Sequence, residues 1–190
     1  MKIDLNDIFN TILLLSRGFG IDLSVNFKKP PTSLVNSIGI NKANVLLITI
    51  THDEIFLFTV YFLLDKAAKK LKLKHFMEVE PYIKQDLLPA LMVLYTLDAE
   101  KDEKRKTVFN PDNFMSLFKE RFSEYLEFNL QNDIVPIAYF LEIMTKSFEK
   151  LEYYKRDPNF LKNNKLNIFA LDDFKWLDEK VDELVDEYFI

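Results

Sequence analysis

The chain has 190 residues, of which 48% are hydrophobic and 29% charged, and its formal net charge is −5. This length suits one domain with a substantial core, and this balance excludes both a disordered chain and a bundle of membrane helices. There is no cysteine. Its absence excludes disulfides, thiolate nucleophiles and cysteine-bound zinc or iron–sulfur centres, and it fits a cytoplasmic location.

The first predicted element is a helix over residues 5–17, where apolar residues recur at helical spacing and Gly18 follows as a C′ residue. We expect no signal peptide, because acidic residues precede its apolar patch and no small-residue cleavage site follows. In residues 21–27 apolar and polar residues alternate, which is a strand pattern. Residues 45–50, VLLITI, are read as a second strand or as the first turns of a helix.

The apolar stretch over residues 45–64 has a polar centre, His52-Asp53-Glu54. Carboxylates near mid-bilayer are costly, so we expect no membrane span here. Thr51 and Glu54 have the spacing of a capping box, in which each side chain accepts from the backbone amide of the other. This pattern predicts that a buried helix begins at Thr51, runs to about residue 74 and ends in a lysine-rich segment.

Polar loops are expected to join the remaining helices. The DAEKDEKRK segment, residues 98–106, is predicted to be a solvated tail or loop, and residues 156–167 form a loop by composition. Helices are predicted over residues 81–101 with a kink or break at Pro89, from Asn110-Pro111 onward, over about 133–151 and over about 171–188. The prediction is a mainly α-helical single domain, 1–190, a bundle of five to seven helices to which residues 21–27 and 45–50 could add a short N-terminal β-element.

The His52-Asp53 dipeptide could in principle ligate a metal that activates water, as in metal-dependent hydrolases. Such a site needs further ligands, and the second histidine, His75, lies 23 residues further on. At the helical rise, that separation is roughly 35 Å. Helix capping is therefore the favoured interpretation, and we assign no catalytic, cofactor-binding or metal-binding residue.

Other motifs carry little chemistry. His75 and Glu78 share a helix face, but a di-iron bundle needs two Glu-x-x-His pairs and the sequence contains none in that order. Gly18-Phe19-Gly20 lacks the spacing of a dinucleotide site and reads as a turn. The lysines of residues 66–74 are interleaved with apolar residues and are read as a solvated helix face, so we do not expect nucleic acid to bind.

The C-terminal segment, residues 171–190, carries eight acids and two lysines and predicts an acidic amphipathic helix. Its apolar residues are spaced 3, 4, 3, 4, which is a heptad seam. Either the seam completes the core with the acids facing water or the lysine-rich helix end, or the helix docks on a basic partner. The candidate partner-binding residues are Trp176, Asp178, Glu179, Asp182, Glu183, Asp186 and Glu187.

The leading functional hypothesis is a non-enzymatic, cytoplasmic protein–protein interaction module, such as an adaptor, inhibitor, immunity-type or chaperone-like protein, whose partner has a basic surface. One alternative is a helical regulatory domain that binds a small apolar ligand among the many phenylalanines. A third is a metal-dependent hydrolase that uses His52 and Asp53. The sequence supplies no cofactor motif and leaves the oligomeric state open.

Overall fold

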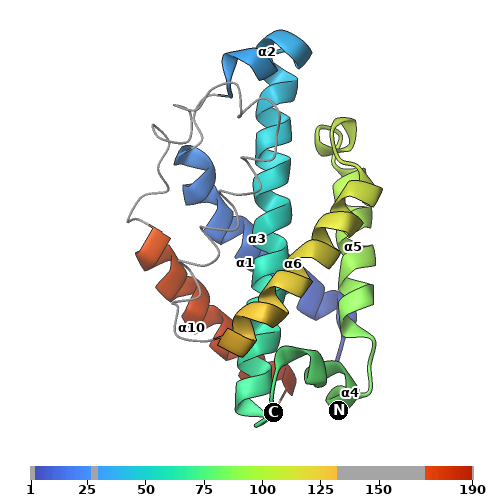
Figure 1. The fold of residues 1–190 in the computed structure, drawn as a ribbon, viewed down its shortest axis with the longest axis vertical. Helices are drawn as coiled ribbons and strands as arrows, with labels where there is room; N and C mark the ends of the chain where they lie inside the picture. The colour runs from blue at the N-terminus through green and yellow to red at the C-terminus, as the bar shows by residue number, and fades with distance from the viewer. Residues whose placement is uncertain (1–2, 27–29, 132–169, 190) are drawn as a thin grey trace.

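The computed structural model describes residues 3–26, 30–131 and 170–189, in which helices pack around one long helix, α3 (Ile40–Lys70). In Figure 1, α3 stands upright at the centre, α6 crosses it obliquely and α5 lies beside it. The other helices are α1 (Leu5–Asn26), α2 (Thr32–Ile38), α4 (Val79–Ile83), α5 (Leu87–Lys101), α6 (Pro111–Gln131) and α10 (Ala170–Phe189), with 3-10 turns η1 (Phe76–Glu78) and η2 (Arg105–Thr107). The described residues thus hold seven α-helices, which confirms the prediction of a mainly α-helical bundle.

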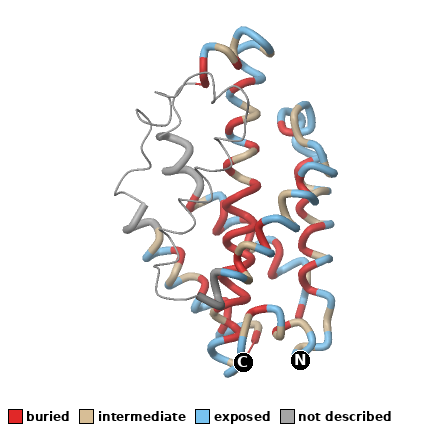
Figure 2. The backbone as a smooth tube through the Cα atoms, viewed as in Figure 1, coloured by how far each residue is buried: buried red, intermediate tan, exposed pale blue. Residues whose placement is uncertain are grey.

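The central helix α3 is buried on every side from Asp53 to Asp65. Figure 2 shows continuous burial there, and every residue from Asp53 to Asp65 is buried. Within the described residues, α3 is the one helix long and apolar enough to cross a membrane, with a mean hydropathy of 1.6 over its most apolar stretch. In the structure 72% of that stretch is buried, and the core helix of a soluble protein has the same length and composition.

The described residues contain no strand, so the optional N-terminal β-element is not present among them. Residues 21–26 continue α1, and residues 45–50 lie inside α3. Both apolar runs were too short for their periodicity to separate a strand from a helix. Gly18 does not end α1 as predicted; the helix passes through it for two further turns.

The helix break predicted at Pro89 occurs earlier in the chain, before α5 begins. The predicted helix over residues 81–101 is broken at residues 84–86, where Lys84 has a left-handed backbone with φ 54°. Pro89 lies in the first turn of α5, where a missing amide hydrogen costs no helix bond. Asn110 caps α6 as predicted, because its Oδ1 accepts from the amide of Asn113 at 2.9 Å.

The helix predicted over 133–151 and the loop predicted over 156–167 lie outside the described residues. The C-terminal helix is confirmed as α10, which contacts both α1 and α3.

Aromatic stacking joins α3 to its neighbours. The Phe56 ring of α3 stacks on Tyr95 of α5 with centroids 4.0 Å apart, and Tyr61 of α3 stacks on Tyr125 of α6 at 4.3 Å. All four side chains are almost wholly buried. Stacked pairs of this kind add to stability beyond the apolar area they bury, so they help fix α5 and α6 around α3.

Candidate functional site

The polar centre of α3 lies in the middle of that helix and does not begin it. Thr51 follows eleven helical residues, and its hydroxyl donates to the carbonyl of Leu47 at 2.9 Å. The predicted capping box is therefore wrong. Within a helix, a threonine hydroxyl can donate a hydrogen bond to the carbonyl four residues back. Thr51 therefore fits inside a helix and does not have to mark its start.

Asp53 is the centre of a buried polar cluster between α3, α5 and η2. Its Oδ1 accepts from the Tyr95 hydroxyl at 2.8 Å and from Nη2 of Arg105 at 3.2 Å. The Arg105 Nη2 also donates to the Tyr95 oxygen at 2.9 Å, which closes a triangle of three side chains. Asp98 then links Arg105 to Arg17 of α1, at 3.7 and 3.0 Å respectively. We call these five residues the Asp53 cluster.

Burial alters the protonation of this cluster. Desolvation raises the pKa of Asp53 to about 7, although the charge of Arg105 and the bond from Tyr95 oppose the rise. For the neighbouring His52, desolvation and the charges of Arg105 and Arg17 lower the pKa to about 4. At neutral pH, His52 is therefore an uncharged imidazole, and the carboxyl group that follows it in the sequence has a raised pKa.

Glu54 makes a second buried contact, between α3 and α6. Nε and Nη2 of Arg121 on α6 donate to its two carboxylate oxygens at 2.8 and 2.9 Å. The side chains are 0% and 1% exposed. Nη1 of Arg121 donates to Glu124 at 2.6 Å. Burial alone would lower the pKa of Arg121, but the hydrogen bonds and charge of Glu54 raise it, so Arg121 stays ionised.

Neither histidine lies in a metal site formed by the described residues. Among the described residues, no three His, Asp or Glu side chains are placed to hold a metal ion. The carboxylate of Asp53 is engaged by Tyr95 and Arg105, and Nε2 of His75 pairs with Glu78 at 3.4 Å on its own turn. In the described part of the chain, His52 and Asp53 thus lack the further ligands that metal-assisted hydrolysis needs.

Helix α10 is held by its apolar seam. Leu177, Val181 and Leu184 of the predicted seam are buried, and Phe174 and Tyr188 at its ends are partly buried. Trp176 lies beside this seam with its ring against Gly18 of α1, and it remains 40% exposed. The seam therefore packs within the bundle.

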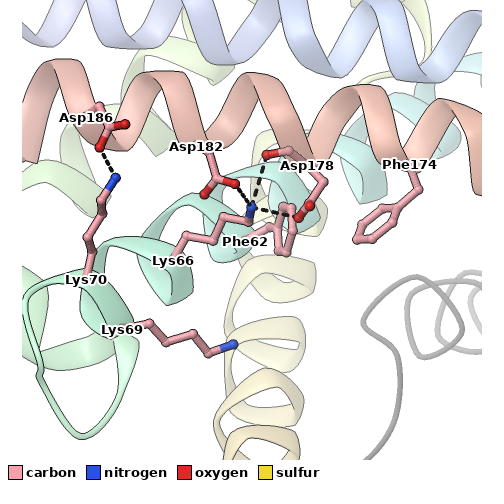
Figure 3. Close-up of a pocket in the computed structure, with 8 residues that line it drawn as sticks. All are labelled: Phe62, Lys66, Lys69, Lys70, Phe174, Asp178, Asp182 and Asp186. Atoms are coloured by element: carbon pink, nitrogen blue, oxygen red, sulfur yellow. Dashed lines mark hydrogen bonds and ion pairs between the residues drawn. The ribbon is translucent and has the colours of Figure 1, made fainter.

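The six acids predicted to bind a partner fall into two rows with different surroundings. Figure 3 shows the first row, Asp178, Asp182 and Asp186, facing lysines of α3. Lys66 lies 2.7 Å from Asp178 and 2.7 Å from Asp182, and Lys70 pairs with Asp186. The groove between the two helices has a volume of about 730 Å³. These aspartates thus meet the lysine-rich end of α3.

The second row, Glu179, Glu183 and Glu187, is exposed. Glu183 pairs with Lys180 of the same helix at 2.6 Å. Since the residues are four apart, they form a line along one face of α10. Trp176 precedes Glu179 by three residues and Glu183 by seven, which places its exposed edge on the same face.

Sequence reasoning missed two arginines. Arg105 was read as part of a solvated tail, yet it is 6% exposed, and Arg121 was passed over although it is 1% exposed. A signal existed for Arg121, because it lies four residues before Tyr125 on the apolar face of α6. For Arg105 there was none, since its burial depends on η2 folding back onto α3.

No family model, no curated protein and no solved structure matches this chain.

Proposed function

We propose that the protein is a helical protein-interaction module, and that α10 presents an acidic face to a basic segment of another protein. The observation that carries this proposal is the exposed row Glu179, Glu183 and Glu187 on a helix whose other face is fixed. Lys180 pairs with Glu183 in the middle of this row, and a basic partner would compensate the remaining negative charge of the row.

The way α10 is anchored supports this role. Its buried seam and the Asp178, Asp182 and Asp186 row hold it against α1 and α3, so the glutamate row is presented on a rigid element. A fixed row loses less conformational entropy on binding than a mobile tail would. The partly exposed ring of Trp176 adds an aromatic edge, a residue type that is enriched at interfaces.

The polar centre of α3 favours this proposal over hydrolysis. Asp53 and Glu54 are engaged by Arg105 and Arg121, which join α3 to η2 and α6. Their chemistry is thus used to position helices. The cavity beside His52 has a volume of about 10 Å³, roughly the space of a single water molecule, which is too small for an apolar ligand.

The test compares two triple variants of equal charge change in a pull-down from cells that produce the protein. Glu179→Gln, Glu183→Gln and Glu187→Gln together remove the exposed row. The control carries Glu100→Gln, Glu103→Gln and Glu127→Gln, which are exposed elsewhere. We expect the first variant to lose its partner and the control to retain it, with binding that weakens as salt rises. Equal binding by both variants would contradict the proposal.

A further inference from the structure

Helix α5 has an apolar outer face. Its residues 87–97, LLPALMVLYTL, contain no charged side chain. One side of the helix is buried in the core, but Val93 is 59% exposed, Leu97 is 45% exposed and Pro89 is also exposed. These three residues are spaced by four and thus form a line along the helix. In Figure 1, α5 lies at the edge of the bundle, and no other described helix lies beyond it. A helix that is apolar all round is normally buried, so this line lacks a cover.

Helix α1 runs beside α5 and parallel to it. Just before α1 begins, the backbone of Ile3 exchanges two hydrogen bonds with the side chain of Gln85, at 3.2 and 3.0 Å. Further along both helices, Arg17 pairs with Asp98 at 3.0 Å. These two contacts fix the level of each residue of α1 relative to α5.

Leu14 extends the apolar line onto α1. It is 67% exposed and lies one turn before Arg17, while Leu94 lies one turn before Asp98 on α5. Because each leucine is on the same side of its helix as the charge that follows it, the two leucines are neighbours. Single exposed apolar residues are ordinary, whereas a contiguous patch marks an interaction site. We call this patch the α5 face, and it consists of Leu14, Pro89, Val93, Leu94 and Leu97.

The charges at the two ends of the α5 face indicate its occupant. Asp86 immediately precedes α5 and Lys101 is its last residue, and both are exposed. At the helical rise they lie about 22 Å apart, too far to pair within one chain. An antiparallel copy of the same helix sets Lys101 opposite Asp86 at both ends, and it brings Lys84 near Glu100. A parallel copy would set like charges side by side, and it would also align the two helix dipoles unfavourably.

We propose that the α5 face joins two copies of this chain across a two-fold axis, with the two α5 helices antiparallel. The midpoint between Asp86 and Lys101 falls between Val93 and Leu94, which places the axis at the centre of the face. The same residues then contribute from both copies, as an isologous interface requires. The α5 face shares no residue with α10, so this inference is independent of the proposed function.

Sedimentation equilibrium of the full chain over a dilution series tests the proposal. We expect the native chain to associate to twice its monomer mass. Val93→Glu should weaken association about 30-fold or more, because each dimer then buries two carboxylates without partners. Ile48→Glu, which replaces an apolar residue of α3 that is 42% exposed, should leave association unchanged. A native chain that is monomeric at every concentration would mean that another protein or only solvent covers the α5 face, which overturns the proposal. Dimerisation that survives Val93→Glu overturns it as well.

A charge exchange tests the antiparallel arrangement. Asp86→Lys and Lys101→Glu should each weaken association about fivefold, since each substitution places two pairs of like charges across the axis. The double variant should regain the association of the native chain, and circular dichroism should show the same helix content in all variants. Because the two residues lie too far apart to interact within one chain, such a recovery arises only across the interface. Additive losses in the double variant would contradict the proposed pairing.

Discussion

The indole ring of Trp176 on α10 lies against Gly18 on α1, so close that a Cβ added to Gly18 would stand 2.9 Å from Cη2 of the ring. Glycine in a helix interior is less favourable than alanine by about 1 kcal/mol. Here that residue allows two helices from opposite ends of the chain to approach. Gly18 therefore serves helix packing, and the helix end predicted at this position does not exist.

Replacing Gly18 with alanine should displace the Trp176 ring toward solvent. Because the chain has one tryptophan, its fluorescence reports this contact alone. We expect the emission maximum to move to longer wavelength. The free energy of unfolding should change by less than about 1 kcal/mol, since the better helix propensity of alanine offsets the displaced contact.

Gly39→Ala is the matched control for this substitution. Gly39 has φ +82° and nothing within 4 Å of an added Cβ, so alanine there strains the backbone without touching Trp176. A loss of roughly 1 kcal/mol with unchanged emission is expected. If Gly18→Ala also left the emission unchanged, the Trp176–Gly18 contact would be refuted.

Thr51→Val distinguishes a threonine within a helix from a helix cap. Valine keeps the shape of the side chain and removes only the hydroxyl that donates to Leu47. Since this bond lies within α3 and contributes little to helix stability, we expect a change within about 0.5 kcal/mol in urea unfolding. A loss of about 1 kcal/mol or more, typical of a removed N-cap, would be inconsistent with the continuous α3 helix.

His52 and Asp53 should impose opposite pH dependences on stability. The pKa of His52 is about 4 in the folded protein and 6.5 in the unfolded chain, so its contribution is complete above pH 6.5 and is lost as pH falls toward 4. The pKa of Asp53 is about 7 when folded and 3.8 when unfolded, so its contribution is complete below pH 3.8 and is lost as pH rises toward 7. Between about pH 4 and 6.5 the two largely cancel.

Single substitutions should therefore reveal slopes that the native protein hides. In His52→Asn the free energy of unfolding should fall as pH rises from 4 to 7, by up to about 1.4 kcal/mol per pH unit. In Asp53→Asn it should rise over pH 4 to 6.5 by a similar amount. Urea unfolding at several pH values measures both, and slopes of the same sign in the two variants would contradict this assignment.

Periodicity in the sequence was sufficient to predict the helices that have an apolar stripe. Helix α10 and the start of α6 lie where the heptad seam and Asn110-Pro111 predicted them, because each helix has one face that must be buried. Helix α3 lacks such a stripe, since it is buried on all sides from Asp53 to Asp65. Its polar centre was consequently mistaken for a boundary.

The candidate site was less predictable, because it depends on partners that are distant in the sequence. Asp53 and Glu54 are separated from Arg105 and Arg121 by 52 and 67 residues. Charge alone could not show which arginine reaches which carboxylate. The burial of a carboxylate inside an apolar run does, however, require a buried cation nearby, and this requirement could have directed attention to Arg121 on the apolar face of α6.

The central claim is that the polar residues of α3 hold the bundle together, and a double-mutant cycle on Glu54 and Arg121 tests it most directly. Arg121→Met leaves a buried carboxylate without its main partner and should cost about 3–5 kcal/mol of unfolding free energy. Glu54→Met should cost less, since Arg121 keeps its bond to Glu124. We predict that the double variant loses at least about 2 kcal/mol less than the sum of the two losses.

The exposed pair of Lys180 and Glu183 provides the comparison, and its coupling should stay below about 1 kcal/mol. If the losses at Glu54 and Arg121 instead add to within about 0.5 kcal/mol, the two residues act independently and the claim is wrong.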